Sequence, residues 1–196
     1  MAIMTSRQAS ELDFALERNG WTSEDVKKVS GGDLLAELLL VVRGRAKVVV
    51  KSILVFLRTV KVAAQPAVAT SEEYFKEAGV VWMGGDFKAQ FLGLEVPTIE
   101  EAELAVRKLE EASPDIPILA ELEDKAEISV SQFRAFLSAH RESSEWFIFY
   151  LRGRDGNLWA VFAYWCVDYG GWRVGADSVT FPGRWFRGSQ VVSQVA

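Results

Sequence analysis

The sequence predicts an α+β protein, in which an N-terminal helical segment precedes an antiparallel, aromatic-rich β-meander packed against two or three helices. Aromatic and β-branched runs within residues 146–179 are divided by Asp-Gly and Gly-Gly, a pattern typical of antiparallel hairpins. Matches to the helix capping box open two apolar patterns, at residues 98–112 and 129–140. Before residue 43, apolar residues recur at helical spacing between glycine stops.

The N-terminal segment divides into three short predicted helices. The first covers residues 6–19 and ends at Gly20. Thr22 is a good N-cap for the second, and acidic residues follow in the first turn, where the helix dipole favours them. Asp33 can cap the third, whose apolar residues are Leu34, Leu35, Leu38, Leu39 and Val42.

Residues 43–62 are compatible with a helix or with one or two strands, and we expect the helix. The β-branched content and Gly44 favour strands instead. As one helix, the segment would place five bases within an arc of about 80°, and with Arg45 they form an expected basic patch: Arg43, Arg45, Lys47, Lys51, Arg58 and Lys61. Such a helix can contact an anionic membrane surface, although packing on the protein with a solvated basic edge is the favoured interpretation. Its longest uncharged run, residues 52–57, is far shorter than the roughly 20 residues that span a bilayer.

A change in composition marks the expected domain boundary. Residues 63–70 are small and uncharged and include a proline, so they are the best linker candidate. Residues 38–70 carry six bases and no acids, whereas residues 71–145 carry seventeen acids and seven bases. We therefore expect a helical, partly basic segment over residues 1–65 and an α+β domain with an antiparallel sheet over residues 71–196.

Within the second domain, Ser71 opens a short helix that ends at Gly79, and a strand at residues 80–83 follows. We expect a turn at residues 84–86 and a strand or helical turn at 87–92. The two capping boxes predict helices over residues 98–112 and 129–140. A short final strand is expected at residues 189–194.

Side-chain alternation in the aromatic strands leaves the covering of the sheet open. Trp159, Val161, Ala163 and Trp165 share one face, and the intervening residues, also apolar, share the other. Either the sheet is covered on both sides, or one aromatic face is exposed and functional.

No catalytic motif rises above chance. The single cysteine, Cys166, excludes an internal disulfide framework and favours a reducing, cytoplasmic setting, and no signal peptide is visible. A Cys166–His140 dyad is conceivable, but a cysteine inside an aromatic strand is more often an inert hydrophobe. The lone histidine cannot supply a histidine-based metal site, and Asp155 and Asp168 suit turns. We expect no metal and no cofactor.

Arginines interleaved with aromatic residues are the most suggestive functional feature. The candidate binding residues are Arg152, Arg154, Trp159, Trp165, Trp172, Arg173, Trp185 and Arg187. Such residues dominate protein interfaces, and they also stack bases in single-strand binders. We expect a non-catalytic binding or adaptor protein that acts through contacts with another protein or with its own copies. The alternatives are binding of single-stranded nucleic acid and, last, an enzyme of unknown class.

Three runs carry a resemblance: residues 20–28 (Gly-Trp-Thr-Ser-Glu-Asp-Val-Lys-Lys), residues 100–109, and residues 147–161 with the Asp-Gly-Asn-Leu-Trp-Ala-Val strand and a following Tyr/Gly/Trp hairpin. The chain resembles small uncharacterised bacterial proteins that share this strand and hairpin. The resemblance covers most of residues 71–196 and the stretch near Trp21. It implies a compact bacterial module and carries no activity, ligand or catalytic residue.

Overall fold

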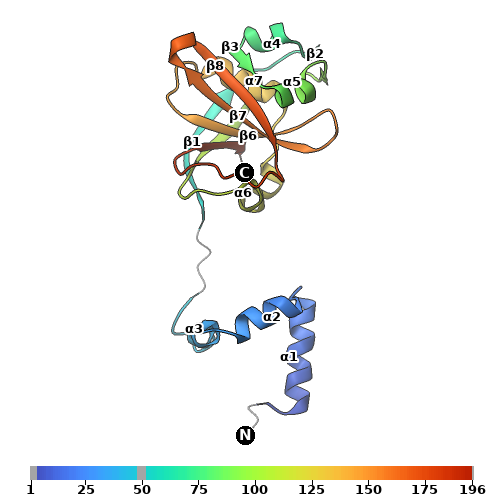
Figure 1. Cartoon of the computed structure of the whole chain (residues 1–196), viewed down its shortest axis with the longest axis vertical. Coiled ribbons are helices and arrows are strands. Elements are labelled where there is room, and N and C mark those ends of the chain that lie inside the picture. Colours follow the sequence, from blue (N-terminus) through green and yellow to red (C-terminus); the bar gives the residue numbers. More distant parts are fainter. Residues whose placement is uncertain (1–3, 48–51, 196) are drawn as a thin grey trace. The chain divides into compact units, whose positions relative to one another are not determined.

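The computed structural model describes residues 4–47 and 52–195, and the chain divides into two compact units, Met1–Lys51 and Ser52–Ala196 (Figure 1). The class is α+β, as predicted. The division lies earlier than the boundary expected between residues 65 and 71. Strand β1 (Leu54–Val62) pairs from end to end with β5 (Ala102–Leu109), so it belongs to the sheet of the second unit.

The described residues of unit 1 form three helices at the predicted places: α1 (Ser6–Arg18), α2 (Ser23–Ser30) and α3 (Leu34–Val42). Thr22 caps α2 through a reciprocal box with Asp25, as its sequence indicates. The expected side-chain cap at Asp33 is wrong, because its backbone is already helical and its carboxylate makes no capping hydrogen bond. The helices of this unit contain no fully buried residue.

The single helix expected over residues 43–62 is wrong. Arg43 ends α3, Gly44 follows with φ +68°, and the segment from Leu54 onward is a strand. Residues 48–51 lie outside the described part of the chain. The β-branched residues of β1 suit a sheet, and eight cross-strand residue pairs with β5 stabilise the strand.

Unit 2 is built on a sheet whose described strands run in the order β1-β5-β9-β6-β7-β8-β3. The remaining strands are β3 (Val80–Met83), β6 (Trp146–Arg152), β7 (Leu158–Cys166), β8 (Gly171–Ser178) and β9 (Gln190–Gln194). Strands β6, β7 and β8 pair antiparallel, but β9 runs parallel to β6 and β3 runs parallel to β8. The sheet is therefore mixed, which corrects the expected antiparallel one. Because β9 lies between two strands that point in opposite directions, it must be parallel to one of them.

The helix expected over residues 98–112 is also wrong, because this stretch contains the strand β5 between β1 and β9. The hydroxyl of Thr98 accepts a hydrogen bond from the N–H of Ala67 at 3.1 Å instead of capping a helix. The expected linker forms the short strand β2 (Val68–Ala69), paired with β4 (Glu95–Val96). The expected turn at residues 84–86 opens the helix α5 (Gly85–Phe91).

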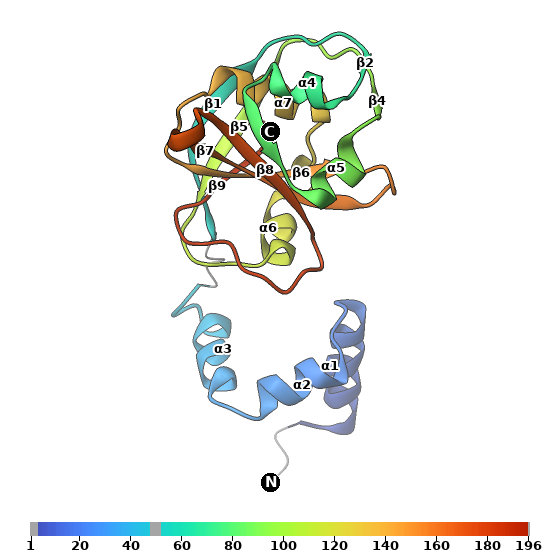
Figure 2. The same cartoon turned by 45° about the horizontal axis from the view of Figure 1, so that its top comes forward.

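Helices cover the two faces of the sheet unequally (Figure 2). The inner face packs against α4 (Glu72–Lys76), α5 and α7 (Val130–Ala139), with phenylalanines from the helices and strands in one core. The outer face packs against α6 (Asp115–Leu122), whose Ile118 and Leu122 contact a smaller core around Tyr150. Short 3-10 turns, η1 (Glu123–Lys125) and η2 (Val167–Tyr169), complete the unit. The predicted helix at 129–140 is confirmed as α7, with its capping box of Ser129 and Gln132.

Candidate binding surface

The outer face is covered by α6 over parts of β1, β5, β6, β7 and β9, and it is open at the end of the sheet where β7 ends and β8 begins. Strand register aligns four residues across this half, one from each of β6, β7, β8 and β3: Trp146, Tyr164, Arg173 and Trp82. We call these four residues the aromatic row. Trp146 and Trp82, at its two ends, are each 43% exposed, whereas the rings of the inner core are closed to solvent. An exposed aromatic row beside a well-packed core is a typical feature of an interaction site.

Stacking contacts hold the aromatic row in one arrangement. The rings of Trp146 and Tyr164 lie parallel, with centroids 4.2 Å apart and an interplanar angle of 11°. The guanidinium of Arg173 lies 4.7 Å from the ring centroid of Trp82 and 5.9 Å from that of Tyr164. Cation–π contacts of this kind contribute about 0.5–2 kcal/mol each. Arg173 is therefore held between two rings rather than extended into solvent.

Glycines allow β3 to approach β8 closely enough to form this arrangement. A Cβ on Gly171 would lie 2.3 Å from Cγ1 of Val81 and 2.7 Å from the carbonyl oxygen of Gly79, closer than real Cβ atoms come. The Gly170 backbone has φ +59° and ends the turn before β8. The N–H of Trp172 donates to the Gly79 carbonyl at 2.8 Å, which fixes Trp82 opposite Arg173.

Beside the end of the row is a cavity of about 240 Å³ lined by Val81, Trp82, Tyr169 and Arg173. Tyr169 is 71% exposed and Val81 is 49% exposed, so the apolar walls are open to solvent. Nε of Arg173 is buried and has no hydrogen-bond partner within the described residues. The cavity therefore combines apolar walls with a cationic donor group.

The covered half of the outer face is organised by Asp115, at the start of α6. Its Oδ1 accepts hydrogen bonds from the Tyr150 hydroxyl at 2.8 Å and from Nε1 of Trp185 at 2.7 Å. Burial raises the pKa of Asp115 above its usual value, donation from Trp185 and Tyr150 opposes that rise, and the charge of Asp177 adds to it. This carboxyl joins α6, β6 and the loop before β9. We interpret it as a structural anchor, since its accepting oxygen is already occupied.

The sequence-predicted binding residues do not form one surface. Trp172 is fully buried on the inner face and donates to the carbonyl of Leu137, so its expected binding role is corrected. Trp159 and Trp165 pack, half-buried, against the same inner core, and Trp185 is held by Asp115. The exposed arginines make local contacts: Arg152 with Glu127, Arg154 with the Leu92 carbonyl, and Arg187 with Glu110. Of the eight candidates, only Arg173 belongs to the aromatic row.

Trp82 and Trp146 were missed as binding candidates. Each tryptophan is followed by a buried residue, Met83 after Trp82 and Phe147 after Trp146, and the sequence places both tryptophans in ordinary apolar runs. Alternation along β6 could have indicated that Trp146 shares a face with Tyr150, but not that α6 leaves that end of the face open.

The basic patch is divided between the two units. Arg43, Arg45 and Lys47 are exposed in unit 1, and Lys51 lies outside the described residues. On β1, Arg58 contacts Glu145 at 3.6 Å and Lys61 contacts Glu101 at 3.8 Å. The arc of bases expected from one helix therefore does not exist, because Arg58 and Lys61 lie on the strand β1.

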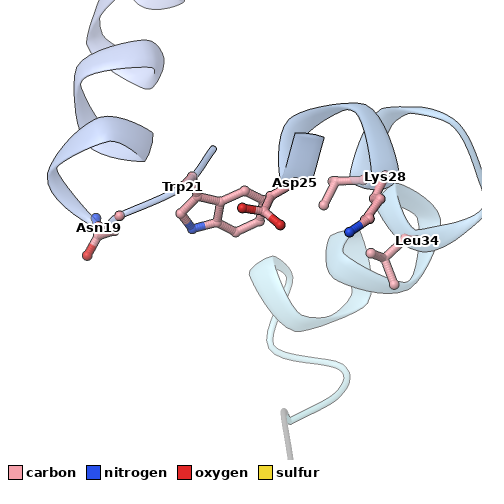
Figure 3. Close-up of a pocket in the computed structure, with 7 residues that line it drawn as sticks. Asn19, Trp21, Asp25, Lys28 and Leu34 are labelled. Atoms are coloured by element: carbon pink, nitrogen blue, oxygen red, sulfur yellow. The ribbon is translucent and has the colours of Figure 1, made fainter. Parts of the chain in front are cut away.

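Unit 1 has a shallow opening of its own, about 420 Å³, between the α1–α2 connection, α2 and α3. Figure 3 shows Trp21, Asp25, Lys28 and Leu34 around it. The Asp25 carboxylate already accepts hydrogen bonds from the N–H and the hydroxyl of Thr22. These hydrogen bonds lower the pKa of Asp25, and burial offsets only part of that decrease. We interpret the opening as a consequence of a unit whose described helices have no closed core.

The residues considered for catalysis have local structural contacts. His140 ends α7, stacks on Phe136 with ring centroids 4.1 Å apart, and shares a hydrogen bond of 2.9 Å with the Phe136 carbonyl. Cys166 is half-buried at the end of β7. Among the helices of the described residues, none has the length and apolar character needed to cross a membrane.

Comparison of the chain with protein-family models, with curated proteins and with solved structures gave no match. The resemblance to small bacterial proteins therefore stays a prediction, and function has to be argued from the geometry of the chain.

Proposed function

We propose that this is a non-catalytic binding protein whose second unit holds a protein partner on the open half of its outer face. The observation that carries this proposal is the aromatic row, with tryptophans exposed at both ends of a rigid stack. Tryptophan, tyrosine and arginine supply most of the energy at protein interfaces because they bury large areas at low entropic cost. The partner is another protein or a second copy of this chain. A bacterial origin and a cytoplasmic setting belong to the same proposal.

Charge favours a protein partner over a nucleic acid. Unit 2 contains fourteen bases and twenty acids, a net charge of −6, and the aromatic row contributes one cation, Arg173. Nucleic-acid binding depends on several cations that neutralise phosphates. Base stacking on Trp82 or Trp146 is the feature that keeps the nucleic-acid alternative open. An enzyme of unknown class is the third candidate and depends on Cys166 or His140.

Site-specific photo-crosslinking in cells of the source organism tests the proposal. A benzophenone amino acid would replace Tyr169, which lies at the open cavity, and in a matched control it would replace the exposed Glu73 of α4, on the inner side of the sheet. We expect a discrete protein adduct from position 169 and none from position 73.

Other outcomes count against the proposal. Absence of an adduct, or the same adduct from both positions, would contradict an interface at this face. An adduct removed by nuclease would favour the nucleic-acid alternative. In a separate titration, steeply salt-dependent binding of a mixed oligonucleotide would do the same.

A further inference from the structure

Among the residues that the structure describes, none gives the cation Arg173 an anionic partner. Its guanidinium lies between the rings of Trp82 and Tyr164, and within the described residues its Nε has no hydrogen-bond acceptor. The rings cover the guanidinium plane but cannot accept the in-plane N–H groups. Buried polar groups in native proteins usually find a partner, and a bound water, ion or ligand is one way in which such a group is satisfied.

The contacts around Arg173 also fix its direction before any ligand arrives. A long arginine side chain normally loses conformational entropy when it is immobilised on binding, which weakens affinity. Here the two rings already hold it, so less of this loss remains. The planar donor fork of a held arginine matches the two oxygens of a carboxylate or of a phosphate.

The surroundings favour a carboxylate over a phosphate. Unit 2 carries a net charge of −6, and Asp168 lies in η2 next to the cavity residue Tyr169. A dianionic phosphate meets more repulsion in this field than a monoanionic carboxylate does.

The volume of the cavity limits the size of the group to which the bound carboxylate is attached. Its volume of about 240 Å³ is below the roughly 300–1,000 Å³ of pockets that enclose whole small molecules. Its walls beside Arg173 are Val81, Trp82 and Tyr169, which suit an apolar or aromatic group. We propose that Arg173 receives the C-terminal carboxylate of a partner chain whose last residue is apolar or aromatic and enters this cavity. This inference rests on the proposed function and names the group that the surface recognises.

The test uses the full chain and three small probes, so it needs no knowledge of the partner. N-acetylphenylalanine mimics a terminal aromatic residue, its amide lacks the charge, and 3-phenylpropanoate lacks the peptide group. Binding is followed by the side-chain Nε–H resonance of Arg173 in ¹H–¹⁵N spectra. We expect the acid to bind saturably and to move this resonance, and the amide to bind about tenfold more weakly.

Substitutions then assign the effect to one side chain. Arg173→Lys keeps the charge but removes the planar fork, and affinity for N-acetylphenylalanine, measured by calorimetry, should fall about tenfold. Arg184→Lys, at an exposed arginine of the same unit, is the matched control and should leave affinity unchanged. Circular dichroism and the melting temperature confirm that both variants fold.

Three results would overturn the inference: equal binding of acid and amide, equal loss in the two variants, or no saturable shift at any soluble probe concentration. Equal affinity for 3-phenylpropanoate would overturn the assignment to a chain terminus, in favour of a free aromatic acid. If the probes do not bind but position 169 crosslinks to a protein, a partner binds without this anchor. If the acid probe binds but position 169 gives no crosslink, the cavity is a site for small acids and the protein partner is refuted.

Discussion

The hydroxyl of Tyr150 offers a direct test of how the covered half of the outer face is held. It donates to Oδ1 of Asp115 at 2.8 Å, and both side chains are buried, with 0% and 4% of their surface exposed. Tyr150→Phe removes this one oxygen and keeps the ring in the small core that α6 covers. Among the described residues, Trp185 is then the remaining donor to that oxygen.

A buried hydrogen bond to a charged group contributes about 1.5–3 kcal/mol, so we expect Tyr150→Phe to lower the free energy of unfolding by about 2 kcal/mol. For a chain of this length, each kcal/mol shifts the melting temperature by roughly 2–4 °C, so the decrease should be about 4–8 °C. Urea unfolding followed by tryptophan fluorescence measures it. The signal reports mainly on unit 2, because six of the seven tryptophans lie there.

The stability lost in Tyr150→Phe should depend on pH, and the shifted pKa of Asp115 determines whether the loss grows or shrinks as pH rises. Burial raises this pKa above its ordinary value of 3.8. A raised pKa means that the contribution of this carboxyl to stability is full below pH 3.8 and is lost as pH rises through the raised value. The Tyr150 hydroxyl favours the ionised form, so its removal should cost about 2 kcal/mol above that pKa and about 1 kcal/mol below it.

Tyr164→Phe is the matched control, since its ring lies half-buried in the aromatic row, and its loss should stay within about 0.5 kcal/mol. A loss from Tyr150→Phe no larger than that of the control would refute Asp115 as an anchor. A loss that stays constant across the acid range would refute the role assigned to its ionisation.

Two further predictions concern the core and the exposed row. Phe149→Ala should lower the free energy of unfolding by about 3–5 kcal/mol, because Phe149 is fully buried and its ring centroid lies 4.9 Å from that of Phe133 and 5.2 Å from that of Phe136. The control Phe186→Ala should change the free energy of unfolding little, because Phe186 is 75% exposed. Equal urea midpoints for the two variants would contradict this packing. In acrylamide quenching, Trp82→Phe should reduce the accessible part of the fluorescence and Trp172→Phe should not, since these indoles are 43% and 0% exposed; the opposite order would show that the aromatic row is covered in solution.

Local chemistry decided the elements that the sequence predicted correctly. The helix α7 begins where Ser129 and Gln132 satisfy each other's backbone N–H groups, and α2 begins in the same way at Thr22. These signals need no partner from elsewhere in the chain. The turn before β8 is local too, because Gly170 takes a conformation that few other residues adopt. The α+β class followed from such elements.

Pairing between distant residues decided the elements that the sequence predicted wrongly. Residues 98–112 carry a capping pattern and good helix formers, yet their central part is β5, because β1 on one side and β9 on the other supply its hydrogen bonds. Intrinsic preferences of a few tenths of a kcal/mol per residue are easily outweighed by such pairing and by burial. The same pairing makes a strand of the basic stretch at residues 54–62.

The sequence by itself determined that arginine and aromatic residues gather in the strands of residues 146–179, and that their two faces are both apolar. It could not determine which face the helices cover. That depends on α6 closing one half of the outer face through Asp115, and on β3 joining β8 in parallel to bring Trp82 beside Arg173. A residue's exposure is set by what packs over it, and for the aromatic row only the tertiary structure decides that.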